Sequence, residues 1–434
     1  VVWSGEDNLG TLVLGEFEIF GQRLDAASGF EVGTNDFRIS DMGPDSDPIY
    51  DALSSAIVYN PVNNEYLVVW DGDDLTGTIG DEEFEIFAQR LAGATCLPVG
   101  DNDFRVSDMG PDGDPNFDAL VPAAAFSAAS GQYLVTWAGE DNTGLLVSGE
   151  FEIYGQLLAA NGAPVGANDF RISMMGNDGD PTYDGFAPAV AFDSADNQFL
   201  VVWEGDDILG LLANGEFEIF GQRLSSAGVA LGTDDFRISD LGVDGDPLLD
   251  AERPSVAYNT ASNEYLVVWA GDDGTAPLVN GESEIWGQRI SAATGLEIGD
   301  NDFRLSDVGL DGDAFRDGFE PGVAFAQGAN EYLVIWQGDD DGYASNQDEF
   351  EIYAQLFANS ASADVGDDSS NPGNRDRLQV NPNPMRGPTR IQASRPGAGQ
   401  VELSLVDVSG RLVLARKVSA DPSGRVEWSL NASE

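Results

Sequence analysis

Residues 264–269 read EYLVVW, and this apolar segment recurs through most of the chain. Each copy, or a close variant of it, ends in a tryptophan, and successive tryptophans lie 66 or 67 residues apart. The six are Trp3, Trp70, Trp137, Trp203, Trp269 and Trp336. A fixed period of this length indicates a repeat architecture in which each copy folds as one unit.

Every full repeat contains four strand-like segments. The first is small and apolar, as in AVAF at 189–192, and the second, EYLVVW, is apolar on both faces. The third mixes acids with aromatic residues, as in EFEIFGQRL at 216–224, and the fourth alternates, as in DFRIS at 36–40. This order runs from small residues to an amphipathic edge, which is the radial gradient of a β-propeller blade.

We therefore predict an all-β chain in which residues 1–358 form a six-bladed β-propeller, with five blades as the alternative count. A linear β-solenoid is the competing architecture, although 66 or 67 residues is long for one solenoid coil. Because the chain opens in mid-pattern at Val1, we expect a preceding segment to complete the first and last blades. The residues expected to be buried nearest the axis are Ala124, Ala191, Ala257 and Ala324.

Composition excludes several functions. The formal net charge is -56, and residues 1–374 hold 70 of the 76 acidic residues but only 11 of the 20 basic ones. Such a domain has no basic patch for nucleic acid or an anionic membrane. The chain has no histidine and one cysteine, Cys96, so Ser–His and Cys–His nucleophiles and an internal disulfide are excluded. No apolar run approaches the length of a membrane span.

One repeated group of acids joins the loop after each tryptophan to the paired glutamates of the third strand. The spacing from loop to strand is constant, whereas the other loop residues vary freely. The candidate metal ligands are Asp7, Glu16 and Glu18; Asp74, Glu83 and Glu85; Asp141, Glu150 and Glu152; Asp207, Glu216 and Glu218; Asp273, Glu282 and Glu284; and Asp340, Glu349 and Glu351.

A second repeated group follows the fourth strand and has the pattern Asp-x-Asp-x3-Asp. Acids two residues apart around a glycine resemble the start of a calcium loop, but the closing glutamate of an EF-hand is absent. The candidate ligands here are Asp45, Asp47 and Asp51; Asp112, Asp114 and Asp118; Asp178, Asp180 and Asp184; Asp244, Asp246 and Asp250; and Asp311, Asp313 and Asp317.

Three interpretations of these acids stand side by side. Oxygen-only clusters suit a hard cation, so we predict several Ca²⁺ sites. Solvated or halophilic surface charge is the first alternative, because Asp and Gly also suit turns. The second alternative is pairing with arginines across the sheet. Those arginines are Arg38, Arg105, Arg171, Arg237 and Arg304.

Residues 1 to about 357 resemble a widespread group of bacterial secreted repeat proteins, whose YLVVW, IYGQR and FRIS units are usually taken to be β-propellers. After a polar, acidic linker at 359–376, the elements NPNP (381–384), TRI (389–391) and VELSLVDVSGRLV (401–413) resemble an immunoglobulin-like domain of flagellar hook-cap type. That group includes type IX secretion sorting domains. The resemblance implies export and an incomplete immunoglobulin-like β-sandwich at 377–434.

From these features we expect a non-enzymatic, secreted, calcium-stabilised structural protein of the cell surface or matrix. Its expected partners are other copies of itself, joined head-to-tail into a filament or surface layer. An adhesin or carbohydrate-binding propeller is the alternative, with Trp286 as a contact residue and a surface glycan or matrix as partner. A glycoside hydrolase is a minor alternative, because catalytic carboxylates are normally unique and these are repeated.

Overall fold

A computed structural model describes residues 1–434 apart from 7–11, 75–81, 208–211, 309–310, 313, 315, 339–349, 359–376, 382–388, 395–399, 407–411, 420–424 and 431–434. The chain divides into two compact units. One comprises Val1–Arg23 and Val32–Asn359, and the other comprises Leu24–Glu31 and Ser360–Glu434. Among the described residues, no helix has the length and apolar character needed to cross a membrane.

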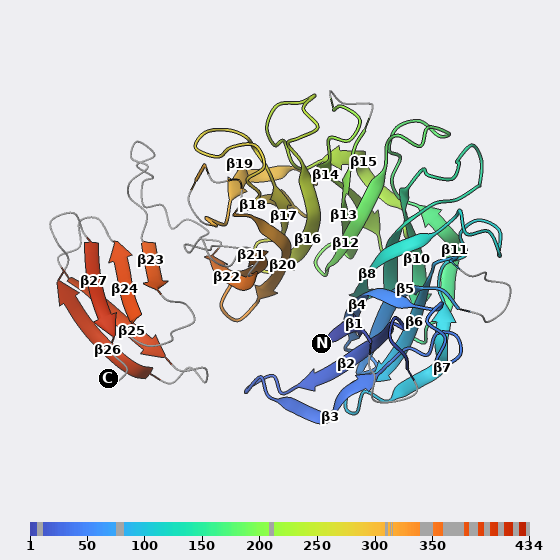
Figure 1. The fold of residues 1–434 in the computed structure, drawn as a ribbon, viewed down its shortest axis with the longest axis horizontal. Helices are drawn as coiled ribbons and strands as arrows, with labels where there is room; N and C mark the ends of the chain where they lie inside the picture. Colours follow the sequence, from blue (N-terminus) through green and yellow to red (C-terminus); the bar gives the residue numbers. More distant parts are fainter. Residues whose placement is uncertain are drawn as a thin grey trace. The chain divides into compact units, whose positions relative to one another are not determined.

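Six antiparallel sheets form a six-bladed β-propeller, which confirms the predicted fold (Figure 1). Each full blade is a meander of four strands, and the first and last blades have three strands each. The blades in chain order are β1 (Val2–Gly5), β2 (Glu18–Leu24) and β3 (Glu31–Arg38); β4 (Ala52–Asn60), β5 (Glu65–Gly72), β6 (Glu85–Ala92) and β7 (Pro98–Arg105); β8 (Ala119–Ser127), β9 (Gln132–Gly139), β10 (Glu152–Ala159) and β11 (Pro164–Arg171); β12 (Gly185–Asp193), β13 (Gln198–Gly205), β14 (Glu218–Ser225) and β15 (Ala230–Arg237); β16 (Ala251–Asn259), β17 (Glu264–Gly271), β18 (Glu284–Ser291) and β19 (Glu297–Arg304); and β20 (Gly318–Ala326), β21 (Glu331–Gly338) and β22 (Glu351–Ala358).

The remaining five strands belong to the C-terminal unit and form two small sheets, in the orders β23-β24-β27 and β25-β26. The strands are β23 (Arg377–Asn381), β24 (Thr389–Ser394), β25 (Gln400–Val406), β26 (Leu412–Ser419) and β27 (Arg425–Leu430). The immunoglobulin-like identity of this unit and the domain boundaries drawn from the sequence stay predictions.

The second strand of each full blade is buried on both faces because two neighbouring blades cover it. In blade 2, Val68 and Trp70 pack in one cluster with Ile19 of blade 1, whereas Leu67 and Val69 pack against blade 3. All five side chains are fully buried. Burial of an aliphatic side chain contributes about 1.5–3 kcal/mol, so packing between blades stabilises the repeat array.

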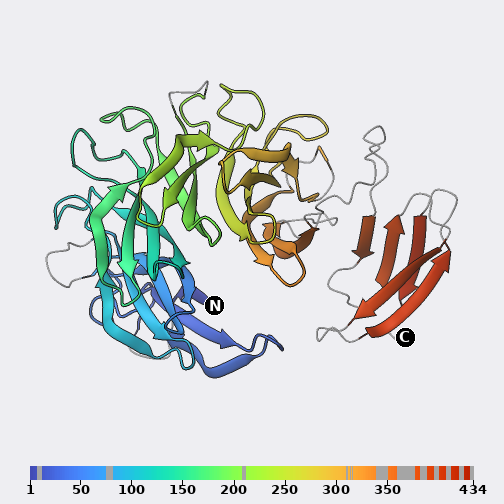
Figure 2. The same ribbon diagram turned by 180° about the vertical axis from the view of Figure 1, so that it is seen from behind.

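The first strands of blades 2 to 6 lie side by side on the inner side of the unit, as Figure 2 shows from behind. The predicted burial of their small residues is confirmed for Ala191 and Ala257. It is wrong for Ala324, which is exposed, and Ala124 is only half-buried. Ala324 lies in blade 6, and no further sheet of the propeller unit follows that blade among the described residues.

Each inner strand contains a β-bulge near its start, where the pairing register with the second strand shifts. The bulged residue has a positive φ although it is never glycine, and such a conformation is strained for residues with a Cβ. The five are Ser54 (φ 33°), Val121 (51°), Ala187 (46°), Arg253 (52°) and Glu320 (48°). The bulge therefore belongs to the repeat, whereas the side chain it presents changes from blade to blade.

In every blade the second strand ends, the third begins, and the chain enters the next inner strand at the same end of the meander. The loops at this end carry the repeated carboxylates, and we call it the acidic end. The inner-strand bulges also lie there, because they fall within the first few residues of each inner strand. The fold thus gathers the repeated acids and the variable bulge residues at one end of the propeller.

Candidate functional site

In blades 1 to 5 the second glutamate of the third strand is buried against an arginine of the neighbouring outer strand. In blade 4, Glu218 is fully buried and accepts hydrogen bonds from Arg237, Ser239 and the backbone N–H of Leu241. Burial raises the pKa of Glu218 to about 7, although Arg237 and Ser239 lower it. In the other blades of this set the equivalent glutamate accepts hydrogen bonds from the arginine and serine of its own blade. These glutamates are Glu18, Glu85, Glu152 and Glu284.

In blades 1 to 5 the first glutamate of the third strand instead accepts backbone N–H groups of the loops. Glu216 accepts N–H groups from Ala213 (2.7 Å) and Gly245 (2.8 Å). Buried carboxylates that accept N–H groups satisfy donors that would otherwise cost free energy. The equivalent bonds to the loop after the fourth strand are made by Glu16, Glu83, Glu150 and Glu282.

The Asp-x-Asp-x3-Asp loops divide their three acids among different partners. The first aspartate pairs with the arginine, at 2.7–2.9 Å, in Asp45, Asp112, Asp178, Asp244 and Asp311. The third accepts the backbone N–H between the two glutamates, at 2.8–3.0 Å, in Asp51, Asp118, Asp184, Asp250 and Asp317. The middle acids Asp47, Asp114, Asp180 and Asp246 are partly exposed.

The loop aspartates after the tryptophans also accept hydrogen bonds. Asp74, Asp207 and Asp273 accept the backbone N–H of Gly43, Gly176 and Gly242, and Asp141 accepts the hydroxyl of Thr143. Glu351 begins β22 and is partly exposed. The predicted ligands that lie outside the described residues are Asp7, Asp313, Asp340 and Glu349.

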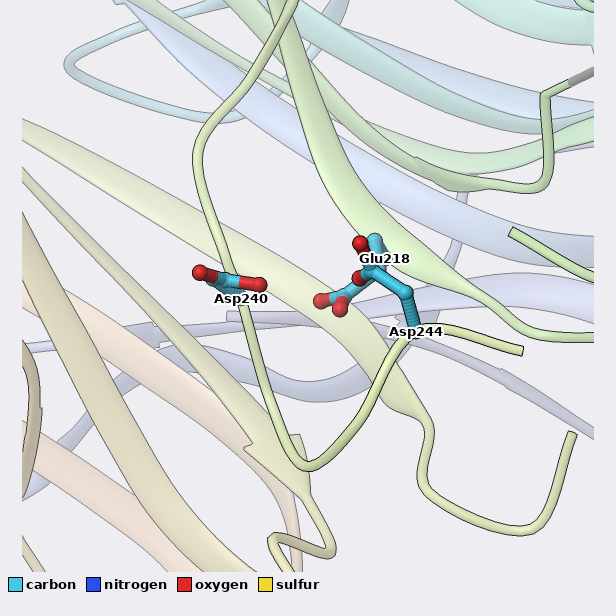
Figure 3. A group of neighbouring side chains, drawn as sticks. All are labelled: Glu218, Asp240 and Asp244. Carbon is cyan, nitrogen blue, oxygen red and sulfur yellow. The ribbon is translucent and has the colours of Figure 1, made fainter. Parts of the chain in front are cut away.

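Within the part of the chain that the structure describes, two groups of carboxylates converge closely enough to hold a metal ion. They are Glu218, Asp240 and Asp244, drawn in Figure 3, and Glu282, Glu284 and Asp311. Both groups already contain an arginine, because all three carboxylates of the first pair with Arg237, and Glu284 and Asp311 of the second pair with Arg304. The arginine pairing weighed as an alternative is thus present in the five blades with an outer strand, and calcium binding stays a prediction.

A second kind of site appears where the repeat is broken. The residue after each blade tryptophan is an acid only in blades 2 and 4, where it is Asp71 and Glu204. Asp71 accepts the backbone N–H of the next blade's bulge residue, Val121, at 3.1 Å, and Glu204 does the same for Arg253. Both acids therefore hold a strained bulge in place.

Glu204 differs from Asp71 in what surrounds it. The side chains of Arg253 and Glu320, on the bulges of blades 5 and 6, form an ion pair of 2.9 Å and are 58% and 53% exposed. Glu252, next to Arg253, is exposed as well. An exposed ion pair contributes about 0–1 kcal/mol to stability, so stability does not explain this charged group.

The environment also alters the ionisation of the two acids. Burial raises the pKa of Glu204 to about 7, and the nearby Glu252 and Glu320 carboxylates add to the rise. Burial raises the pKa of Asp71 to about 6, with Asp118 adding to it. Glu204 is partly exposed, whereas only 2% of Asp71 is exposed. Glu204 therefore combines a raised pKa with a side chain that solvent reaches.

Sequence reasoning missed this group because it searched for acids shared by all blades. The signal lies in the starts of the inner strands, which read ALSS, ALVP, GFAP, AERP and GFEP. Only the last two place a charged residue on the bulge. Trp286, the candidate contact residue from the sequence, is 7% exposed and donates its indole N–H to the carbonyl of Gly271, so it is part of the core.

Comparison with protein-family models and with curated protein sequences gives no match. Solved structures do match. A thermostable family-43 glycoside hydrolase has 13% identity and a TM-score of 0.39, covering 71% of this chain and 89% of its own. An α-L-arabinofuranosidase from Lactobacillus brevis has 9% identity and a TM-score of 0.37, covering 70% and 90%. An N-acetylgalactosamine deacetylase from F. plautii has 12% identity and a TM-score of 0.39, covering 87% and 88%.

The expectation of a non-enzymatic structural protein is contradicted by these matches, and self-assembly into a filament stays a prediction. These structures include glycoside hydrolases. Not every charged group repeats, because Glu204, Arg253 and Glu320 come together only once among the described blades. Identities of 13% or less and TM-scores near 0.4 assign neither an activity nor a substrate to this chain.

Proposed function

We propose that the propeller is a carbohydrate-active enzyme that hydrolyses glycosidic bonds at its acidic end. The observation that carries the proposal is the contrast between two neighbouring carboxyl groups. Burial raises the pKa of Glu204 to about 7, whereas Glu320 is an exposed carboxylate paired with Arg253. A carboxyl group with a raised pKa near a second carboxylate that is held in an ion pair matches the acid and base of a glycosidase.

In the proposed reaction Glu204 donates its proton to the glycosidic oxygen as the bond from that oxygen to the anomeric carbon breaks. A water molecule adds to the anomeric carbon and gives a proton to the Glu320 carboxylate. Arg253 orients Glu320 through the ion pair. Its backbone N–H fixes the Glu204 carboxyl group. The proton then returns from Glu320 to Glu204 through solvent, which restores both groups.

The charge of the protein favours one class of substrate. At a net charge of -56 the acidic end repels polyanions such as uronic-acid polymers. Neutral or amine-bearing glycans meet no such barrier. The proposed substrate is therefore a neutral polysaccharide, and the proposed location is extracellular, where such polymers occur. The sequence resemblance to secreted repeat proteins supports that location.

The test measures release of reducing sugar from xylan, arabinan, galactan and laminarin by the full chain, by Glu204→Gln and by Asp71→Asn. Glu204→Gln should lower the rate at least about 100-fold, because general acid catalysis contributes about 10²–10⁴-fold. Asp71→Asn is the matched control, since it alters the equivalent bulge contact in blade 2. No release by the unmodified chain, or an equal loss in both variants, would contradict the proposal.

Calcium binding is a separate proposal about stability. Its support is the convergence of Glu282, Glu284 and Asp311 at the acidic end. A cation that binds only the folded state raises its stability by mass action. Calcium chloride should therefore raise the Tm more than sodium chloride of the same ionic strength. An equal rise with both salts would show that the salt only screens the repulsion between carboxylates, which would contradict calcium binding.

A further inference from the structure

A cavity of about 590 Å³ lies between blades 2 and 3, and neither Glu204 nor Arg253 nor Glu320 lines it. Blade 2 lines it through Arg90, Asp101 and Phe104, and the hairpin between β10 and β11 lines it through Asn161 and Asn168. Its volume falls within the range of about 300–1,000 Å³ that is typical of small-molecule sites. It belongs to the propeller unit alone.

Arg90 is the residue that distinguishes this cavity. Among the described residues its guanidinium has one hydrogen-bond partner, Glu65 at 3.0 Å, which leaves most of its five N–H donors for a ligand. The equivalent Arg289 makes two bonds to Glu264. The equivalent Arg223 donates to the carbonyls of the next hairpin, at 2.9 and 3.0 Å. The arginine is thus occupied at those two junctions and available at this one.

Two glycines allow the backbone to approach Arg90 and Phe104 closely. A Cβ on Gly100 would lie 2.6 Å from Nη2 of Arg90, and a Cβ on Gly162 would lie 3.1 Å from the ring of Phe104. Both residues have a φ near +86°, where glycine is favoured. Equivalent contacts join Gly232 to Arg223 and Gly228 to Phe170, so the glycines belong to the repeat, and what sets this site apart is the cavity that Arg90 and Phe104 line.

The lining favours a neutral ligand that both donates and accepts hydrogen bonds. Arg90, Asn161 and Asn168 supply donors, and Asp101 and the amide oxygens supply acceptors. The Phe104 ring supplies an apolar surface. The charge of Arg105 is met by Asp108 at 2.7 Å, so it does not attract a free anion. Anionic ligands are also opposed by the net charge of -56.

From this lining we infer that the cavity between blades 2 and 3 is a saccharide-binding subsite. Sugar hydroxyls donate and accept at once, and the apolar face of a sugar ring fits the Phe104 ring. The subsite lies on other blades than Glu204, so it would hold a polymer without contacting the reacting bond. The inference does not depend on hydrolysis, because binding here requires no catalytic group.

The experiment measures binding of xylohexaose, cellohexaose and laminarihexaose to the full chain by calorimetry, with a hyaluronan hexasaccharide as the anionic probe. Glu204→Gln is the background, so that turnover does not obscure binding. The blocking variant is Ala163→Trp, in the exposed hairpin that lines the cavity. The matched control is Val229→Trp, at the same position of the β14–β15 hairpin, which faces Leu157 of blade 3 rather than an arginine.

At least one neutral hexasaccharide should bind, and Ala163→Trp should raise its Kd at least about tenfold by filling the cavity. Val229→Trp should leave the Kd unchanged. The inference is overturned if no neutral probe binds, if only hyaluronan binds, or if the two tryptophan variants behave alike. If hydrolysis fails in the earlier test while these results hold, only the catalytic proposal is lost.

Discussion

Asp71 and Glu204 have the same position in their blades and the same structural task, yet only one has the surroundings of a reactive group. Each follows a blade tryptophan and accepts the N–H of the next blade's bulge. The bulge beside Asp71 carries Val121, whereas the bulge beside Glu204 carries Arg253, which pairs with Glu320. The repeat therefore builds the scaffold, and chemistry is expected where a blade departs from it.

The largest expected effect comes from removing the carboxylate of Glu320, the proposed base. Glu320→Gln should lower hydrolysis by about 10²–10⁴-fold, because the attacking water loses its base. Reducing-sugar release on the substrate preferred by the full chain measures the loss. Glu252→Gln is the control, since Glu252 is exposed nearby but forms no ion pair with Arg253 among the described contacts. Equal losses in the two variants would remove Glu320 from the reaction.

The comparison predicts a smaller effect on stability that both regions share. Asp71→Ala and Glu204→Ala each leave a bulge N–H without its acceptor, which costs about 1–3 kcal/mol where water cannot replace it. Urea unfolding should show a loss of this order for Asp71→Ala. The loss for Glu204→Ala should be lower, because Glu204 is partly exposed. Unchanged stability of Asp71→Ala would show that the bulge holds without its acid.

A third prediction concerns four aspartates away from Glu204, each of which lies between two consecutive blades. Asp103, Asp235 and Asp302 each accept an N–H from the loop of the preceding blade, at 2.9–3.1 Å. Burial raises the pKa of each, and of Asp169, to about 7. The folded state therefore retains protons that the unfolded state has released.

The sign follows from the raised pKa values. The stabilisation is complete below the ordinary aspartate pKa of 3.8 and is lost as the pH rises through about 7. The Tm should therefore fall between pH 5 and pH 8. Asp235→Asn keeps an acceptor for the backbone N–H of Met174 but no longer titrates. The free energy of unfolding should therefore fall less over this pH interval, by on the order of 1 kcal/mol after solvent screening, and the Tm should fall less with it. A Tm that rises over this interval would contradict the assignment.

The fold could be predicted from the sequence because the tryptophan period and the four strand patterns repeat with little variation. The Arg–Glu pairing was also open to prediction, since the arginine keeps one position in every DFRIS-type segment. The backbone partners of Glu216 or Asp250 could not be predicted, because they depend on how two loops meet in space. The contacts of Glu204 could not be predicted either, because they depend on the inner-strand bulges. The bulges bring Arg253 and Glu320, about 50 and 115 positions further along the chain, close to Glu204.

The central claim is that Glu204 carries a proton near neutral pH, and its ionisation can be measured directly. Carboxyl ¹³C NMR of glutamate-labelled protein across pH 4–9, with Glu204→Gln to assign the resonance, gives the pKa of this one side chain. The structure predicts a value of about 7. A midpoint near the ordinary value of 4.5 would show that Glu204 is ionised at neutral pH, and the proposed acid would be lost.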